Sequence, residues 1–253
     1  MNFEFTEEQI MVRDSVARFI QDDYNFDSRQ GIAASEEGIS RDVWSTFAEL
    51  GWLSIPFAEE HGGFGGGAVD VMLVMEQLGK GLVVEPYLAT VLLFGGLLQK
   101  GGNAQLQGEY IPKIIDGSCL GAFAYLERQS RYAIADVKTT AVAKGDDYVL
   151  NGEKVVVFNG NSADHIIVSA RTSGEQCDES GISLFLLPAD AAGLEKLSYR
   201  MMDGQRVANI TLQDVTVPAG NLVGEPGGGF KLIEDVVVEA NMALAAEALG
   251  IME

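Results

Sequence analysis

From Val217 to Phe230 the sequence reads VPAGNLVGEPGGGF, and along this stretch a β-rich region gives way to a helix. Apolar residues then recur at helical spacing from Phe230 to Met252, which predicts one long closing helix. This segment has no later periodic segment to pack against and no C-cap before Glu253. We therefore expect it to be the first helix of a C-terminal helical domain whose remainder is missing.

Short segments rich in β-branched and aromatic residues precede this stretch, beginning after Ser118. Asn151-Gly152 is the strongest hairpin signal among them, because a type I′ turn needs positive φ at both central positions. No helix-length pattern separates the segments, which excludes a parallel sheet with helical crossovers and favours an antiparallel barrel or sandwich. We expect strands at Leu120–Leu126, Thr139–Ala143, Val149–Val157, His165–Ala170, Ile182–Leu187 and Val207–Leu212.

The N-terminal part of the chain has helical periodicity instead. Thr6 and Gln9 form a capping-box pattern ahead of a first helix, and Ser40 can cap a second helix that Gly51 ends. Further helices are expected at Val69–Leu78, Tyr87–Gln99 and Ala104–Ile115. The expected fold class is α+β, with an N-terminal helical bundle (residues 1–116), a middle antiparallel β domain (117–225) and the start of a C-terminal helical domain (226–253).

The charge and the composition narrow the choice of partners and compartment. A net charge of −20 over 253 residues repels phosphate backbones and anionic lipid surfaces, which argues against nucleic acid and membrane partners. No apolar run is long enough to span a bilayer, and residues 1–5 contain no signal-type apolar core. Cys119 and Cys177 could pair, but free thiols in a reducing compartment are the simpler interpretation, so we expect a cytoplasmic protein.

Three features suggest chemistry but fit plainer roles. The glycine run from Gly62 to Gly67 could cradle a phosphate, yet it lacks a Walker lysine and a preceding strand, so we expect a connecting loop. Ser162, Asp164 and His165 are too close in sequence to form a catalytic triad. Two histidines and two distant cysteines leave no ligand cluster, so we expect no metal site.

The whole chain resembles the acyl-CoA dehydrogenase family, and the resemblance is most specific at five segments. They are Lys138–Ala141, Gly145–Lys154, Asn159-Gly160, Gly181–Pro188 and Asp214–Phe230. The resemblance implies a helical domain, a β domain and a C-terminal helical bundle, with FAD between the last two. It also implies an acyl-CoA substrate, a glutamate that removes the α proton, and an electron-transfer flavoprotein or similar acceptor. A homo-oligomer or a large dehydrogenase subunit is the implied protein partner.

The departures from the family pattern lie in its flavin site. Where the family has a Thr-Glu-Pro opening, this chain has Leu126, Glu127 and Arg128, and the family's tryptophan and threonine beside the flavin fall on Val156 and Phe158. The backbone amides of Leu126, Val157 and Phe158 could still form hydrogen bonds to the flavin. The segment from Tyr125 to Tyr132 is similar to the small subunits of pimeloyl-CoA dehydrogenases, which work beside a large subunit. The cofactor-binding residues that the resemblance implies are Tyr125, Leu126, Glu127, Ser130, Arg131, Tyr132, Val156, Val157 and Phe158.

No residue of the chain matches the family's catalytic base. In a minority of the family the base lies on the helix that this chain retains, but that position holds Ala240, and its neighbour Glu239 is expected to be solvated. Three functions remain open: an FAD-dependent acyl-CoA dehydrogenase seen as a fragment or small subunit, a non-catalytic acyl-CoA-binding or structural subunit of a heteromeric dehydrogenase, and a flavin monooxygenase of related architecture.

Overall fold

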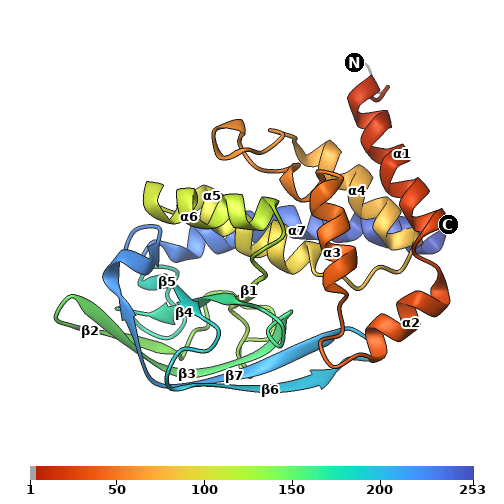
Figure 1. Cartoon of the computed structure of the whole chain (residues 1–253). Helices are drawn as coiled ribbons and strands as arrows, with labels where there is room; N and C mark the ends of the chain where they lie inside the picture. The colour runs from red at the N-terminus through yellow and green to blue at the C-terminus, as the bar shows by residue number, and fades with distance from the viewer. Residues whose placement is uncertain (1–3) are drawn as a thin grey trace.

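A helical layer lies over a β-sheet, and one long C-terminal helix runs alongside both (Figure 1). The structure is a computed structural model that describes residues 4–253. The expectation that the sequence starts without a signal-type core falls partly on Met1–Phe3, which lie outside the described residues. Within the described chain, no helix combines the length and the apolar character that crossing a bilayer would need.

Within residues 4–253, six α-helices lie in the N-terminal layer, and a seventh α-helix follows the sheet (Figure 1). The Thr6 capping box and the Ser40 cap are confirmed, with Thr6 Oγ1 3.2 Å from the Gln9 amide and Ser40 Oγ 3.3 Å from the Val43 amide. The bounds are α1 Glu7–Asp22, α2 Phe26–Ala34, α3 Arg41–Glu49, α4 Ala68–Lys80, α5 Gly96–Gly101, α6 Ala104–Ile115 and α7 Gly229–Met252.

Two parts of the helical layer differ from the prediction. Helix α2 was not expected, because its nine residues have only Ala33 buried and so show no apolar periodicity. The expected helix Tyr87–Gln99 is a π-helical segment, Tyr87–Gly95, that continues directly into α5. A Cβ on Gly95 would collide with the ring of Phe57, so this stretch is packed too closely for a larger residue.

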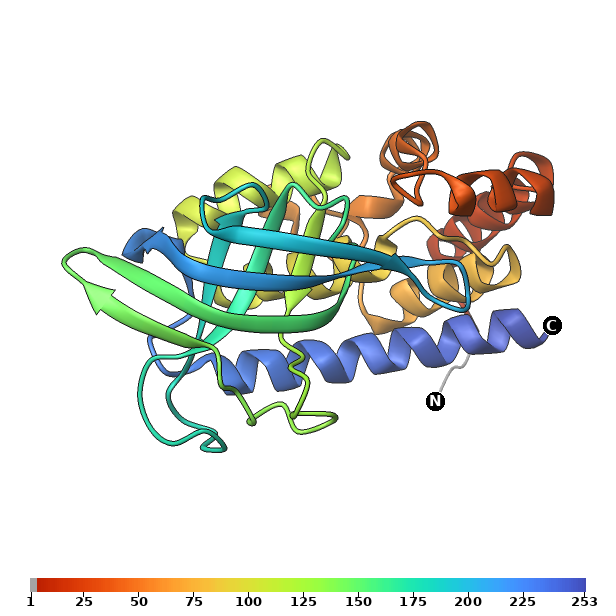
Figure 2. The ribbon, with the colours of Figure 1, turned by 90° about the horizontal axis from the view of Figure 1, so that it is seen from below.

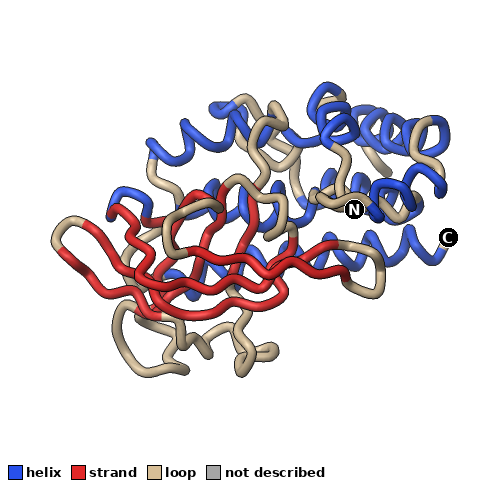
Figure 3. Tube along the Cα trace, turned by 60° about the horizontal axis from the view of Figure 1, so that its bottom comes forward, coloured by secondary structure: helices blue, strands red, loops and turns tan. Residues whose placement is uncertain are grey.

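The β domain is a single eight-stranded sheet with the order β6-β7-β3-β2-β4-β5-β8 and β1 beside β4 (Figure 3). Its bounds are β1 Gly121–Ala124, β2 Thr140–Lys144, β3 Asp147–Phe158, β4 His165–Arg171, β5 Ile182–Pro188, β6 Leu194–Arg200, β7 Arg206–Pro218 and β8 Leu222–Val223. Most pairs are antiparallel, as expected; β1 and β4 run parallel over four residue pairs, and β2 and β4 share one parallel pair. No α-helix lies between β1 and β8 in the described chain.

The predicted hairpin turn at Asn151-Gly152 is wrong. Both residues lie inside β3, at a bulge where the register with β7 shifts, and the β2–β3 turn is formed by Gly145 and Asp146 instead. Gly152 is required by close approach, because a Cβ there would lie 2.5 Å from Thr139 Oγ1. Asn151 exchanges two hydrogen bonds with Asp214 of β7, through its side-chain oxygen and nitrogen. The Asn-Gly pair therefore bends a strand and does not reverse the chain.

Helix α7 packs against α4 through glycines. A Cβ on Gly79 would collide with the carbonyl of Glu247, and one on Gly250 with the carbonyl of Glu76. Two apolar residues of α7, Val236 and Ala240, are buried within the chain. The apolar stripe that does face solvent is formed by Val238, Met242 and Leu249, which are 54, 51 and 47% exposed. Figure 2 shows α7 running along one side of the sheet and of the helical layer.

Candidate functional site

A buried ion pair lies at the point where β1 ends. Lys154 of β3 places its Nζ 2.7 Å from Glu127 Oε1, with 0 and 3% of the two side chains exposed. Lys154 also donates to Ser169 Oγ of β4 at 3.0 Å. The Glu127 carboxylate accepts from the backbone amides of Lys138 at 2.8 Å and Thr139 at 3.0 Å. One carboxylate and one ammonium thus join four segments of the β domain, and their charges are satisfied despite burial.

Both members of this pair are charged at neutral pH. Burial by itself would raise the pKa of Glu127, but Lys154 and the hydrogen bonds to the carboxylate outweigh it and lower that pKa to about 2. Burial lowers the pKa of Lys154 to about 8, and the attraction of Glu127 opposes this change. Sequence reasoning included Glu127 but missed Lys154, although a lone lysine beside Val155-Val156-Val157 was a signal that it needed a buried partner.

A strip of apolar side chains lies above this pair. The Val155 amide donates to the Leu126 carbonyl at 2.9 Å, which joins β3 to the end of β1. Tyr125, Leu126, Val156 and Phe158 are half-buried, so this strip retains accessible apolar surface. The amide of Leu126 has no hydrogen-bond partner within residues 4–253. The strip therefore offers accessible apolar side chains and one free backbone donor, the Leu126 amide.

Val156 reaches the strip through an unusual backbone conformation. Its φ is +52°, and the register between β3 and β7 shifts between Lys154 and Val157. The Val156 amide, turned out of the strand ladder, donates to Asn209 Oδ1 of β7 at 3.2 Å. Positive φ is strained for a β-branched residue, and such strain tends to persist at functional sites. Val157 instead points into the sheet core and is 1% exposed.

The loop after the strip presents two free arginines. Ser130 is buried, and its hydroxyl accepts from the Glu127 amide at 3.0 Å. Arg128 and Arg131 are exposed and have no partner in the described chain; Arg131 has a φ of +48°. Tyr132 is 99% exposed. The nine predicted residues therefore separate into a half-buried strip, a buried group that fixes the loop, and an exposed tip.

Arg171 of β4 holds this loop, and sequence reasoning missed it. It is 8% exposed, and its guanidinium donates to four backbone carbonyls, one in the loop and three in the segment after β4. The carbonyl in the loop is that of Ala135, at 2.8 Å. A charged residue in an otherwise apolar strand was the available signal.

A cavity of about 390 Å³ opens beside the strip, and Phe158 lines both. Its walls come from α4, α7, the segment 83–89 and the β6–β7 loop, and most of the side chains are apolar, including Met75, Leu78, Tyr87 and Leu244. Pockets of this size and character suit small organic ligands. The strip and the cavity therefore share one residue, Phe158.

The features set aside as structural behave as expected. Asp164 accepts from the Leu120 amide and Ser162 donates to the Glu37 carbonyl, while His165 Nδ1 lies 3.8 Å from Cys119 Sγ, so no triad forms. Cys119 and Cys177 are both free. Glu239 is 54% exposed and pairs with Lys100 at 2.9 Å, and it does not line the cavity that Phe158 lines.

Comparison with known proteins agrees with this architecture. Residues 6–118 match the family described as acyl-CoA dehydrogenase, N-terminal domain, and residues 122–215 match its middle domain. The probable acyl-CoA dehydrogenase YngJ of Bacillus subtilis (strain 168) is 33% identical over 267 residues, which cover 100% of this chain and 67% of that protein. The chain spans between 59 and 67% of the length of the curated relatives it matches.

Two solved structures show the same fold. Butyryl-CoA dehydrogenase from Megasphaera elsdenii superposes with a TM-score of 0.89 at 27% identity, covering 99% of this chain and 67% of that chain. The FAD complex of PigA superposes with a TM-score of 0.91 at 25% identity, covering 100% of this chain and 67% of that chain.

Proposed function

Because the chain belongs to the acyl-CoA dehydrogenase family, we propose that it takes part in the FAD-dependent α,β-dehydrogenation of an acyl-CoA thioester. In this proposal the strip of Tyr125, Leu126, Val156 and Phe158 supports the flavin, and the adjoining cavity holds the acyl chain. The observation that supports it most is the position of Phe158, which belongs to the strip and also lines the cavity. A flavin on the strip would lie next to the acyl group it oxidises.

The strip provides some of the contacts that one face of a flavin needs. Its side chains are apolar and half-buried, and the free Leu126 amide can donate to a ring heteroatom. When bound, FAD supplies the acceptor for the β hydride. The chain provides no hydroxyl or indole donor from positions 126, 156 and 158, so two or three hydrogen bonds of roughly 1 kcal/mol each are lost, or about two decades of affinity. We therefore expect weak FAD binding by this chain alone.

A matched pair of substitutions tests the placement of the flavin. Leu126→Thr adds the hydroxyl of the family's Thr-Glu-Pro opening at the site of the free amide, and we expect FAD to bind about fivefold more tightly, since one hydrogen bond is worth about 1 kcal/mol. Leu126→Ala removes the same apolar bulk without adding a donor and should not tighten binding. Flavin fluorescence quenching measures both. Equal dissociation constants for the two variants would contradict the placement.

A second candidate function is a non-catalytic subunit that binds acyl-CoA or supports a large dehydrogenase subunit. The specific observation is Ala240, which occupies the alternative base position and is buried, while its neighbour Glu239 is held at the surface by Lys100. An alanine can neither accept nor donate a proton. Turnover of an acyl-CoA with an artificial acceptor by this chain alone would rule this candidate out, whereas activity that requires a second subunit would support it.

A further inference from the structure

The polar groups of the cavity are mainly hydrogen-bond acceptors. Around its apolar walls lie four carboxylates, those of Glu37, Glu85, Asp203 and Glu247, and three amide side chains, those of Asn159, Asn161 and Gln205. Among the described residues that line the cavity, Arg206 is the one with a permanent positive charge, and its Nε donates to the Ser35 carbonyl at 3.0 Å. The excess of carboxylates over positive charges favours ligands that carry hydrogen-bond donors.

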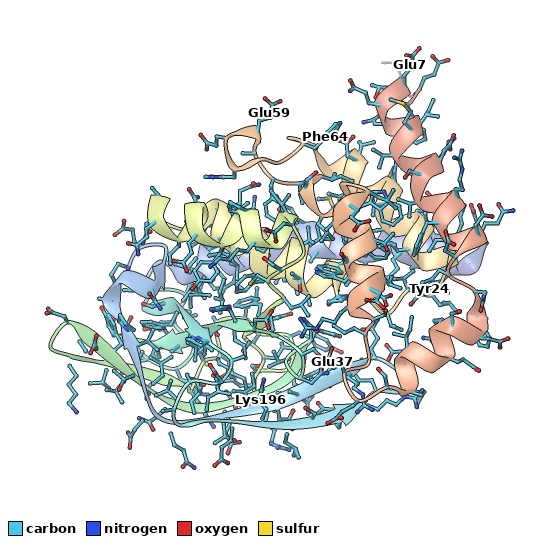
Figure 4. The ribbon with its side chains drawn as sticks, viewed as in Figure 1. Glu7, Tyr24, Glu37, Glu59, Phe64 and Lys196 are labelled. Atoms are coloured by element: carbon cyan, nitrogen blue, oxygen red, sulfur yellow. The ribbon has the colours of Figure 1, made fainter. Side chains whose placement is uncertain are left out.

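Glu85 is the most buried of these carboxylates, with 6% of the residue exposed. The Tyr24 hydroxyl donates to its Oε2 at 2.7 Å and the Ser40 amide donates to its Oε1 at 3.3 Å. The Tyr24 hydroxyl in turn accepts from the Val84 amide at 3.2 Å. Figure 4 shows Tyr24 between α1 and α2, on the side where the helical layer meets the sheet. A carboxylate oxygen accepts more than one hydrogen bond, so Glu85 is fixed in place with acceptor capacity left.

Two further acceptors have no partner within residues 4–253. The Asn161 side-chain nitrogen donates to the Glu37 carbonyl and to Ser162 Oγ, both at 2.7 Å, while its Oδ1 is buried and unpaired. Glu247 of α7 is half-buried with no hydrogen bond or ion pair to its carboxylate. Burial, and then the nearby Asp203, raises the pKa of Glu247, and burial raises that of Glu85. Each of these groups would be stabilised by a donor.

The remaining charged groups do not change this pattern. Glu37 is exposed and pairs with Arg41 at 3.2 Å, and Asp203 is exposed and accepts from the Gln205 amide at 2.9 Å. An anionic ligand would therefore meet one guanidinium and four carboxylates, and like charges repel. A ligand with an unmodified alkyl chain would offer no donor to the carboxylates of Glu85 and Glu247.

We propose that the cavity selects an acyl chain that carries a hydrogen-bond donor, a hydroxyl or an ammonium group, and that Glu85 and Glu247 are the residues that recognise it. This inference rests on the proposed function, because it takes the cavity to be the acyl site. It concerns specificity and assigns no chemical step to these residues.

Binding of four CoA thioesters of equal chain length tests the proposal. They are hexanoyl-CoA, 6-hydroxyhexanoyl-CoA, 6-aminohexanoyl-CoA and adipoyl-CoA, titrated by calorimetry into the full chain. We expect the hydroxy or the amino compound to bind at least tenfold more tightly than hexanoyl-CoA, as a hydrogen bond to a charged group allows. Adipoyl-CoA, which ends in a carboxylate, should bind more weakly than hexanoyl-CoA.

Variants identify the residues responsible. Glu247→Gln should remove most of the preference for the donor-bearing thioester over hexanoyl-CoA. Glu239→Gln is the matched control, because it is the same change on the same helix outside the cavity, and it should keep the preference. Glu85→Gln tests the second carboxylate in the same way. If that buried substitution prevents folding, Glu247→Gln still decides the test, because Glu247 is only half-buried.

The outcomes separate the two proposals. Equal or tighter binding of hexanoyl-CoA would overturn the donor preference and leave the proposed function intact. Tightest binding of adipoyl-CoA would show that Arg206 dominates and would also overturn it. If none of the four thioesters binds, the cavity is not an acyl site, and both proposals are wrong.

Discussion

Lys154 Nζ lies 2.7 Å from Glu127 Oε1, and it also lies within 3.5 Å of the Tyr125 carbonyl two residues earlier. Lys154, a residue of β3, therefore holds the segment that follows β1, which includes Leu126 of the strip. Breaking a buried pair leaves one charge uncompensated, whereas replacing both partners with apolar residues does not. Comparing single and double substitutions therefore tests how much the pair contributes to stability.

Lys154→Met should lower the free energy of unfolding by about 3–5 kcal/mol, because Glu127 would be left buried without its counter-ion. The double variant Lys154→Met with Glu127→Leu should recover much of that loss. Lys100→Met is the control, since it removes the partner of Glu239 in a partly exposed pair and should change stability by less than about 1 kcal/mol. Urea unfolding followed by circular dichroism measures all three. Equal losses for Lys154→Met and Lys100→Met would contradict the role of the pair.

The same pair should appear in the acid stability of the protein. The pKa of Glu127 is lowered from 4.5 to about 2, so the folded chain holds this carboxylate charged where the unfolded chain does not. Its contribution, up to about 3 kcal/mol, is fully present above pH 4.5 and is lost as the pH falls toward 2. The stability difference between the wild type and Glu127→Gln should therefore shrink across that window. A constant difference from pH 6 to pH 2.5 would show that Glu127 is not held charged by the fold.

Arg131 is the residue we expect to contact the FAD pyrophosphate. It and Arg128 are exposed and unpaired within the described chain, and a guanidinium can bind a phosphate through two parallel hydrogen bonds. Arg131→Ala should raise the FAD dissociation constant at least tenfold, or about 1.4 kcal/mol. Arg13→Ala is the control, because it removes a surface arginine of α1 that pairs with Asp14 and does not line the cavity. If neither Arg131→Ala nor Arg128→Ala changes the FAD dissociation constant, neither arginine contacts the pyrophosphate.

The stripe of Val238, Met242 and Leu249 should make the isolated chain self-associate. These residues repeat at i, i+4 and i+11, so they form one face of α7, and each is about half exposed. Burying such side chains between two chains would regain roughly 1.5–3 kcal/mol for each that is fully covered. Met242→Glu should shift the chain toward monomer in sedimentation velocity. A wild-type chain that is monomeric at tens of micromolar would contradict this prediction.

Local sequence patterns were sufficient for the elements whose signals are themselves local. The capping box at Thr6, the cap at Ser40 and the helical repeat of α7 depend on residues within a few positions of one another, and the structure confirms each. The antiparallel character of the β domain followed from the absence of helix-length segments between strands. The family resemblance added the flavin region, because its motifs are contiguous stretches of sequence.

Only the tertiary structure decided the roles that depend on distant contacts. Asn151-Gly152 has the composition of a hairpin turn, but Thr139 and Asp214 occupy the space around it and make it a bulge. The partners of Lys154 and Glu85, which are Glu127 and Tyr24, lie 27 and 61 residues away in the sequence. Charge and burial depend on what surrounds a side chain in space. The same sequence pattern can therefore form a turn in one fold and a strand in another, and the same acidic residue can be solvated or buried.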